Sequence, residues 1–239
     1  MNRLLASAFC LAAGLLSARG ARAADSPETR RVLFIGNSLT YFNDLPAAVA
    51  ALSEPAASPQ LVCEAVVGGG YNLEDHWHKG DALRAIRQGS WSFVVLQQGP
   101  SASEEGRTSL IQWTRRFAAE IRKARAVPAL YSVWPSVSRR QDFDGVLASY
   151  REAARGVDGI LLPAGEAWRM AWKRDPALAL YSDDGLHPTP AGSYLAALVI
   201  YARLSGHSPV GLPAKPEIPA EQAKILQEAA AEAIAKFPD

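Results

Sequence analysis

Five short runs of apolar residues recur along the chain, and segments with helical periodicity separate them. Short, largely apolar runs suit strands, and an unbroken run such as that at residues 32–35 suits a strand buried on both faces, as the central strands of a parallel sheet are. The runs lie at residues 32–35, 60–67, 91–96, 127–133 and 159–162. Strands that alternate with helices in this way predict an α/β fold, with a five-stranded, doubly wound parallel sheet covered by helices on both faces.

The first 23 residues have the pattern of a secretory signal peptide. Arg3 precedes an apolar run at residues 4–16, and Ala21-Arg22-Ala23 is a small-residue cleavage site. We therefore expect cleavage after Ala23, export to the periplasm or the medium, and a single mature domain of residues 24–239. No later segment reaches the roughly 18 apolar residues of a membrane span, so we expect no membrane partner after cleavage.

Charge and cysteine content give no support for nucleic-acid binding and exclude an intramolecular disulfide in the mature chain. The leader carries three arginines and no acidic residue, so the net charge of +1 becomes −2 in the mature chain. Near-neutrality gives no argument for nucleic-acid binding. Cys63 is the only cysteine that remains, so no intramolecular disulfide can form and stability must come from the core.

Ser38 follows the first apolar run, in a small polar turn. Ligands of open α/β sheets bind at the carboxyl ends of the strands, so a serine at this point is placed to be an exposed nucleophile. Alternatively, Ser38 could only cap the next helix. We expect Asn37 to stabilise the turn or to contact substrate, and Asp44 to be the N-cap of the helix that starts with Leu45 and Pro46.

A serine nucleophile needs a base and a group that orients the base. His187 is the best candidate base among the four histidines, and Asp184 lies three residues before it in a loop with Gly and Pro. This spacing allows the carboxylate to fold back onto the imidazole. Asp183 and Asp184 could instead only shape the turn, as aspartates before glycine often do.

Donors for an oxyanion are also present at strand ends. Three glycines, residues 68–70, follow the second run, and the N–H of Gly69 or Gly70 could act together with that of Ser38. A side-chain amide from Gln97 or Gln98, after the third run, could supplement them. A phosphate-binding loop is the rival interpretation of the glycines, but the Lys-Ser/Thr of a P-loop is absent.

Four other residues attract attention. His76 and His78 are two apart, but no acidic or cysteine cluster of metal-ligand spacing accompanies them, so we predict no metal site and expect structural or substrate-rim roles. His207 is expected on the surface. Trp134 follows the fourth run and could either wall the substrate pocket or lie in the core.

Three motifs together resemble those of the SGNH hydrolases, a branch of the GDSL esterase–lipase superfamily. GNSLT at 36–40 resembles the block that holds the nucleophilic serine, the glycines at 68–70 lie where the oxyanion glycine is expected, and DGLHP at 184–188 matches the Asp-x-x-His block. The resemblance covers nearly the whole mature chain. It implies a flavodoxin-like three-layer α/β/α sandwich, a triad of Ser38, His187 and Asp184, and no metal or organic cofactor.

One block departs from the family pattern. The third block usually supplies an asparagine in a Gly-x-Asn-Asp sequence, whereas this chain has LQQGP at 96–100. Some branches are similar in placing a glutamine at this strand end, so the oxyanion role is assigned to Gln97, with Gln98 as the alternative.

The function implied by the export signal and the resemblance is an ester hydrolase that removes acetyl or other short acyl groups from carbohydrate or small esters. The missing asparagine also motivates an alternative: a carbohydrate-binding protein with this fold and weak or lost turnover. A second alternative is a flavodoxin-like nucleotide binder. The sequence does not predict the oligomeric state, nor whether residues 71–80 and 135–142 form a lid.

Overall fold

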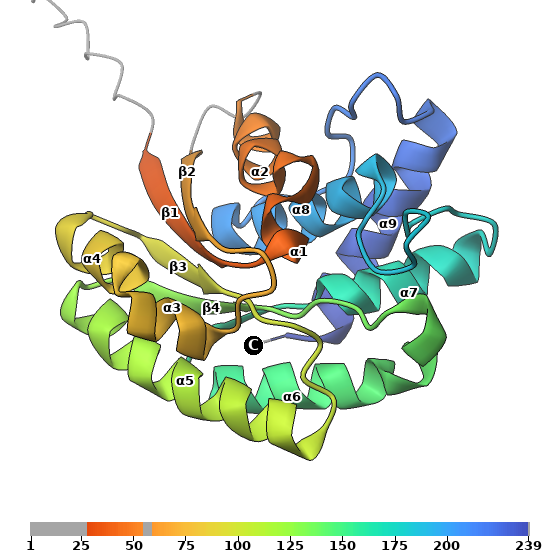
Figure 1. Ribbon diagram of the computed structural model, residues 1–239. Helices are drawn as coiled ribbons and strands as arrows, with labels where there is room; N and C mark the ends of the chain where they lie inside the picture. The colour runs from red at the N-terminus through yellow and green to blue at the C-terminus, as the bar shows by residue number, and fades with distance from the viewer. Residues whose placement is uncertain (1–27, 55–58, 239) are drawn as a thin grey trace, which may run out of the picture.

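The computed structural model describes residues 28–54 and 59–238 (Figure 1). Five parallel strands form one sheet in the order β2-β1-β3-β4-β5, which is the flavodoxin-like order and confirms the expected fold class. The strands are β1 (Thr29–Gly36), β2 (Gln60–Val67), β3 (Phe93–Leu96), β4 (Val127–Tyr131) and β5 (Ile160–Leu162). The expected signal peptide and its cleavage site lie outside the described residues.

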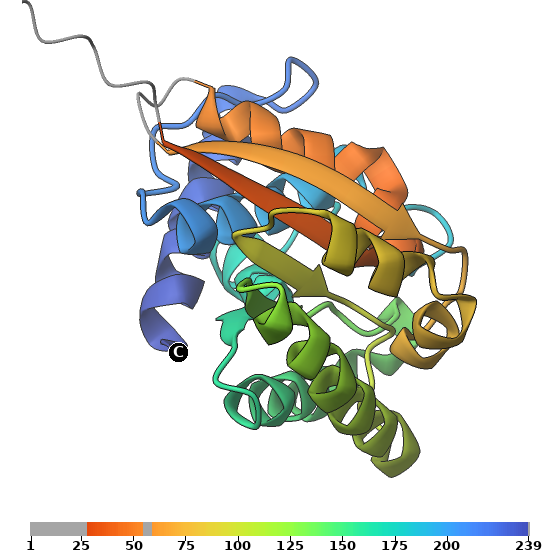
Figure 2. The same ribbon diagram turned by 90° about the vertical axis from the view of Figure 1, so that its left-hand side faces the viewer.

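Helices cover both faces of the sheet and complete a three-layer sandwich (Figures 1 and 2). One face is covered by α3 (Leu73–Lys79), α4 (Asp81–Gln88), α5 (Glu104–Lys123) and α6 (Phe143–Arg155). The other is covered by α2 (Leu45–Ser53), α8 (Pro190–Ser205) and α9 (Ala220–Lys236), with α7 (Ala164–Arg174) packed against α8 and α9. Within the two described stretches, no helix is both long and apolar enough to cross a bilayer.

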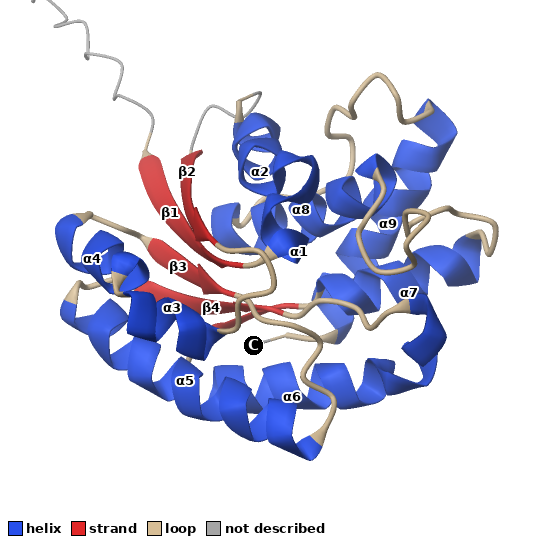
Figure 3. Cartoon of the chain, in the orientation of Figure 1, coloured by secondary structure: helices blue, strands red, loops and turns tan. Residues whose placement is uncertain are grey.

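The chain reverses its direction of progress across the sheet at β1. From β1 it first runs outward to β2 through α2, and then crosses back to β3 on the other side of β1 through α3 and α4. In doubly wound sheets this reversal separates the two flanking crossovers and leaves a crevice at the carboxyl ends of the strands. The loops that follow β2, β3 and β4 leave the sheet at this same edge (Figure 3).

Strand register determines which residues meet in the crevice. Gly36 at the end of β1 pairs with Val67 of β2, and Ile35 pairs with Leu96 of β3. The residues that come next, Gly68 on one side and Gln97 on the other, therefore flank the turn that begins at Gly36. The Gly68 N–H donates to the Gly36 carbonyl over 3.1 Å, and the Gln97 N–H donates to the Ile35 carbonyl over 2.9 Å.

β3 and β4 are each two residues shorter than their apolar runs, and β5 begins one residue later than its run. Trp91 lies outside β3 because its indole N–H donates to the Ala85 carbonyl at the end of α4, 2.8 Å away. β4 ends at Tyr131, although Val133 and Trp134 beyond it are fully buried. These two residues are therefore apolar because they are buried, although they do not pair with a neighbouring strand. For this reason the apolar run overestimates the length of β4.

The segment after β4 approaches α7 so closely that Gly165 has no room for a side chain. A Cβ built on Gly165 would lie 2.3 Å from the carbonyl oxygen of Val133, a backbone atom that cannot move aside cheaply. The absence of a Cβ at this one position allows α7 to pack against the chain that leads to Trp134.

Substitution of Gly165 tests this close approach. Gly165→Ala should lower the free energy of unfolding by about 1–3 kcal/mol, as overpacking does, although alanine is the better helix former. The matched control is Gly99→Ala, since a Cβ at Gly99 would meet no atom within 4 Å. Urea unfolding should separate the two variants, and equal stabilities would contradict the close packing.

Candidate active site

Ser38 is the first residue of a four-residue helix, α1 (Ser38–Tyr41), that begins directly after β1. Asn37 is the N-cap of this helix, and its Oδ1 accepts a hydrogen bond from the Leu39 N–H over 3.1 Å. Asn37 therefore performs the helix-capping role that was the alternative interpretation of Ser38. The N–H of Ser38, the first helical residue, has no acceptor within the helix. Because Asn37 supplies the cap, the Ser38 hydroxyl is not needed for capping.

The structure brings Ser38, His187 and Asp184 into one hydrogen-bonded chain. Ser38 Oγ lies 2.8 Å from His187 Nε2, and His187 Nδ1 lies 2.5 Å from Asp184 Oδ2. An ionised Asp184 can only accept, so the ring proton resides on Nδ1 and leaves Nε2 as the acceptor for the serine hydroxyl. This is the arrangement that nucleophilic catalysis by serine requires.

Asp184 performs both tasks that its sequence position suggested. Oδ2 holds the imidazole, while Oδ1 accepts the backbone N–H groups of Leu186 and His187 over 2.8 and 2.9 Å and shapes the turn. The hydrogen bond from His187, followed by these two backbone bonds, holds the pKa of the Asp184 carboxyl far below its usual range. The carboxylate thus stays ionised at any pH at which the imidazole can act as a base.

The loop that carries His187 rests on Trp134, whose indole N–H donates to the Leu186 carbonyl over 3.0 Å. The Trp134 ring stacks on that of Trp168, with 3.7 Å between ring centroids, and none of Trp134 is exposed. The expectation that Trp134 walls the substrate pocket is therefore wrong: the side chain lies in the core and supports the histidine loop from beneath.

Asn43 connects the nucleophile segment to the histidine loop. Its Nδ2 donates to the Pro188 carbonyl and to Ser193 Oγ, both at 2.9 Å. Asn43 and Asp44 both adopt the left-handed conformation, with φ of 53° and 52°. Asp44 occupies the N-cap position of α2 as expected, but its side chain makes no capping hydrogen bond. Sequence inspection missed Asn43, because no local pattern marks a contact across 145 residues.

Gln97 braces the serine turn and offers no donor to an oxyanion. Its Oε1 accepts from the Asn37 N–H at 2.9 Å and from Thr40 Oγ1 at 2.7 Å, which identifies that atom as the oxygen. Its Nε2 donates to Asn37 Oδ1 at 3.0 Å and to the Gln98 carbonyl at 2.5 Å. Both amide hydrogens are used inside a site where Gln97 is 0% exposed, so the predicted oxyanion role is wrong.

Gln98 is also directed away from the serine. Its Oε1 accepts the N–H of Leu73 at 3.3 Å, while its Nε2 donates to Ser101 Oγ at 2.9 Å. The side chain thus joins the start of α3 to the loop after β3, and the alternative assignment of the oxyanion role to Gln98 is wrong for the same reason. The donors that remain are backbone groups.

The glycine run forms a tight turn beside Ser38. The Tyr71 N–H closes the turn onto the Gly68 carbonyl at 3.2 Å, and Gly70 adopts a φ of 71° that favours glycine. The N–H groups of the two central residues, Gly69 and Gly70, take no part in this closing bond. Asn37 Nδ2 donates to the Tyr71 carbonyl at 2.9 Å, which ties the turn to the serine segment.

His76 has a structural role that its position in the sequence did not specify. It lies on α3, is 2% exposed, and its Nε2 donates to the Gly36 carbonyl over 2.9 Å. Burial lowers the pKa of His76, and the bond to Gly36 and the nearby carboxylates of Asp75 and Asp81 only partly oppose this effect. A neutral His76 therefore holds the residue two positions before the serine.

The other histidines lie apart from the site. The His78 side chain is largely exposed, and His207 Nδ1 lies 3.3 Å from Tyr201 Oη beyond the end of α8. Among residues 28–54 and 59–238, no three His, Cys, Asp or Glu side chains gather in a way that could hold a metal ion.

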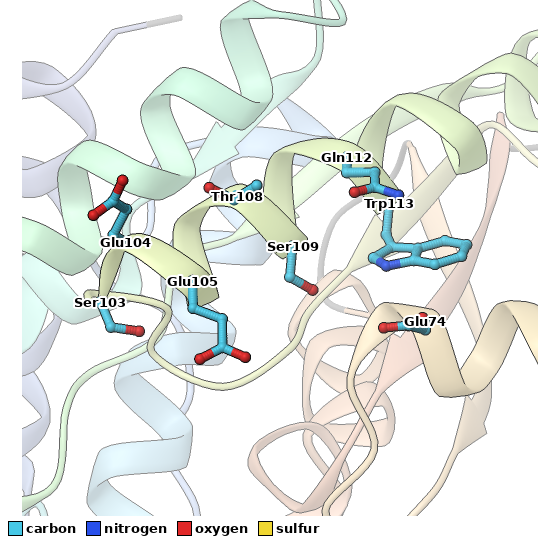
Figure 4. A pocket seen from close by; sticks show the side chains of 8 residues that line it. All are labelled: Glu74, Ser103, Glu104, Glu105, Thr108, Ser109, Gln112 and Trp113. Atoms are coloured by element: carbon cyan, nitrogen blue, oxygen red, sulfur yellow. The ribbon is translucent and has the colours of Figure 1, made fainter.

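A separate cavity of about 700 Å³ lies between the N-terminal ends of α3 and α5 (Figure 4). In Figure 4 the side chains of Glu105 and Ser109 project from α5 into this hollow, with Trp113 at one end and Glu74 of α3 opposite. Neither Ser38 nor His187 lines it. Its size is therefore no guide to where the reaction occurs, and the convergent hydrogen bonds place the candidate site at Ser38.

Comparison with known proteins relates this fold to a superfamily. No protein-family model and no curated protein matches the chain. Among solved structures, a proposed SGNH hydrolase from Slackia heliotrinireducens is 26% identical, with a TM-score of 0.62 over 74% of this chain and 100% of that chain. The chain belongs to the SGNH hydrolase superfamily.

Other structures share the fold of this SGNH chain at lower identity. A DUF4886 family protein from Bacteroides uniformis is 20% identical, with a TM-score of 0.76 over 87% of this chain and 95% of that chain. A mutant of an acetyl-xylooligosaccharide esterase from Geobacillus is 16% identical, with a TM-score of 0.58 over 74% and 95% of the two chains.

Substitution of Gln97 tests its bracing role. Gln97→Leu should lower the free energy of unfolding by about 1–3 kcal/mol, because the Asn37 N–H and the Thr40 hydroxyl would be left buried without an acceptor. Gln112→Leu, at an exposed position of α5, is the control and should leave stability nearly unchanged. Urea unfolding of both variants decides the matter, and a Gln97→Leu protein as stable as the control would contradict the network.

The buried His76 should also make stability depend on pH. Its folded-state pKa lies below the ordinary value of 6.5, so the unfolded state binds the proton more tightly. The contribution of His76 to the free energy of unfolding should therefore be fully present above about pH 7 and should be lost as the pH falls below 6.5. Urea unfolding from pH 5 to 8 should show a weaker fall in His76→Gln. The control, His78→Gln on the same helix, should retain the wild-type fall, and a His76→Gln profile parallel to wild type would argue against a buried neutral imidazole.

Proposed function

We propose that this SGNH-superfamily chain is a serine ester hydrolase. The observation that carries the proposal is the unbroken path from Asp184 Oδ2 through both ring nitrogens of His187 to Ser38 Oγ, with distances of 2.5 and 2.8 Å. With Asp184 ionised, the ring donates from Nδ1–H to the carboxylate, and Nε2 is left to accept the serine proton.

The proposed reaction has two halves. Ser38 Oγ attacks the ester carbonyl carbon while His187 Nε2 takes the hydroxyl proton, and the imidazolium then returns that proton to the departing alcohol oxygen. An acyl group remains on Ser38. In the second half His187 takes a proton from water, the hydroxide attacks the acyl carbonyl, and the proton passes to Ser38 Oγ as the carboxylic acid departs. Asp184 stays ionised and stabilises the imidazolium in both halves.

Backbone N–H groups would stabilise the oxyanion. The Ser38 N–H at the start of α1 and the N–H of Gly69 or Gly70 are the candidates, because both side-chain amides after β3 are engaged in internal hydrogen bonds. Gly69 leaves open space at this point: a Cβ there would meet only Tyr41 Oη, 3.5 Å away. A carbonyl oxygen can therefore approach the turn closely.

The substrate class follows less directly. We infer acetyl or other short acyl esters of carbohydrate, in line with the acetyl-xylooligosaccharide esterase among the structures that share the fold. Small esters remain substrates for the same chemistry, and the proposed reaction needs no metal or organic cofactor. The N-terminal sequence pattern supports export as the setting in which such carbohydrate would be met.

A nucleophile assay tests the proposal. The purified protein should hydrolyse p-nitrophenyl acetate and acetylated xylooligosaccharides, and a fluorophosphonate should label Ser38, as located by mass spectrometry. Ser38→Ala should abolish labelling and lower kcat by about 10³-fold or more, and Asp184→Asn should lower kcat by roughly 10²- to 10⁴-fold. Ser138→Ala, at an exposed serine of η2 (Val137–Asp142), should change neither.

The alternatives give different results in this assay. An unlabelled Ser38 and no ester turnover, together with measurable binding of acetylated xylooligosaccharide, would replace the enzyme by a carbohydrate-binding protein. A nucleotide that copurifies with the protein, seen as absorbance near 260 nm, would favour the nucleotide binder.

A further inference from the structure

The ring of Phe42 lies flat against the imidazole of His187. The two ring centroids are 3.9 Å apart and the ring planes are inclined by only 11°. We propose that Phe42 is a positioning residue that fixes the tilt of the His187 ring and stabilises the imidazolium formed during catalysis. This proposal rests on the proposed function, because it assigns Phe42 a part in the reaction of Ser38.

Hydrogen bonds alone leave one motion of the imidazole unopposed. Asp184 holds His187 at Nδ1 and Ser38 contacts it at Nε2, so both contacts lie at the edge of the ring. The ring can still rock about the line that joins the two nitrogens. An aromatic face parallel to the imidazole blocks that rocking, and catalytic geometry tolerates little of it, since small misplacements of a base cost large factors in rate.

Phe42 is itself held by the segment that carries the nucleophile. Phe42 is the C-cap of α1, and its backbone N–H donates to the carbonyl of Ser38, the first residue of that helix. The next residue, Asn43, donates to the carbonyl of Pro188, which directly follows His187. Phe42 and His187 thus lie beside the hydrogen bond that joins the nucleophile segment to the histidine loop. The Phe42 ring is also stacked with that of the exposed Tyr41, at 5.8 Å between centroids.

The stacking favours the charged form of His187. The face of an aromatic ring is negative, and a cation above it is attracted. Two neutral rings gain little from a parallel, face-to-face arrangement, whereas an imidazolium gains the full cation–π attraction. Because the imidazolium exists only after His187 has taken the serine proton, the interaction is stronger in the transition state than in the resting enzyme, which is the condition for catalysis.

Other charges near the ring are independent of Phe42. Asp184 is the group in direct contact with His187. On the elements packed around the ring, Lys215 Nζ lies 3.5 Å from the Asn43 carbonyl, and Arg139 of η2 is paired with Asp142 at 2.6 Å. The remaining charged groups on these elements are Asp44, Arg140 and Asp183. Substitution of Phe42 leaves all of them in place, so a change in the titration of His187 would report on the aromatic face.

The test compares Phe42→Leu with Phe42→Tyr. Leucine keeps the apolar bulk and removes the aromatic face, while tyrosine keeps the face. The pKa of His187 is measured by NMR on protein with labelled histidines, in which His187→Asn identifies one resonance among the four histidines. We expect Phe42→Leu to lower this pKa by about half a unit, as removal of a partly exposed cation–π contact should, and Phe42→Tyr to retain it.

Kinetics supply the second readout. In Phe42→Leu we expect kcat for p-nitrophenyl acetate to fall about tenfold with KM nearly unchanged, and the acid limb of the kcat–pH profile to move to lower pH with the His187 pKa. Phe42→Tyr should restore both. A Phe42→Leu protein with the wild-type His187 pKa would overturn the proposal, as would an equal loss in Phe42→Tyr.

The NMR measurement keeps this inference separate from the proposed function. A wild-type protein that hydrolyses no ester would remove the esterase, yet the titration of His187 in the two variants would still decide whether the aromatic face stabilises the imidazolium. Thermal unfolding shows whether each variant is folded. Should Phe42→Leu fail to fold, Phe42→Met provides the same comparison with a flexible apolar side chain.

Discussion

The site depends on the parallel pairing of β1 with β2 and β3, which buries Gly36 at the point where three elements converge. The Gly36 carbonyl accepts hydrogen bonds from the Gly68 N–H and from His76 Nε2. No side chain fits there, because a Cβ would lie 2.3 Å from Thr40 Oγ1 and 2.4 Å from Gln97 Oε1. The chain can therefore turn sharply after β1, and the serine emerges in a fixed direction.

Polar groups around Ser38 divide into two sets. The side chains of Asn37, Gln97 and His76 are buried, and their hydrogen bonds go to one another, to the Thr40 hydroxyl or to the backbone. Buried polar groups with satisfied partners rigidify a site, whereas an unpaired one would be costly. The groups left for substrate are the serine hydroxyl with its N–H, His187 Nε2 and the N–H groups of the glycine turn. Gln97, which follows β3 where the family has its asparagine, thus belongs to the frame of the site, and the proposed reaction leaves the oxyanion to backbone N–H groups.

The second half of the site arrives from the far end of the chain and is held by contacts of its own. Trp134 supports the His187 loop from the core, and Asn43 joins that loop to the nucleophile segment. Both residues are ordinary in sequence. Their importance comes from partners 52 and 145 residues away, so no local pattern could mark them. The same distance explains the wrong expectation for Trp134, since a tryptophan after a strand has the same sequence signature whether it faces substrate or core.

Sequence alone determined the order of strands and helices and the three residues that form the hydrogen-bonded chain, because apolar runs and the GNSLT and DGLHP motifs are local signals. It overestimated the lengths of β3 and β4, whose ends depend on packing. It also placed the glycine turn and both glutamines at the correct edge. The tertiary structure decided which way each amide points, that Asn37 caps α1 in place of Ser38, and that Phe42 covers His187. An amide at a strand end can turn toward an oxyanion or back into the frame, and the choice is made by neighbours on other strands that only the packed fold brings within hydrogen-bond distance.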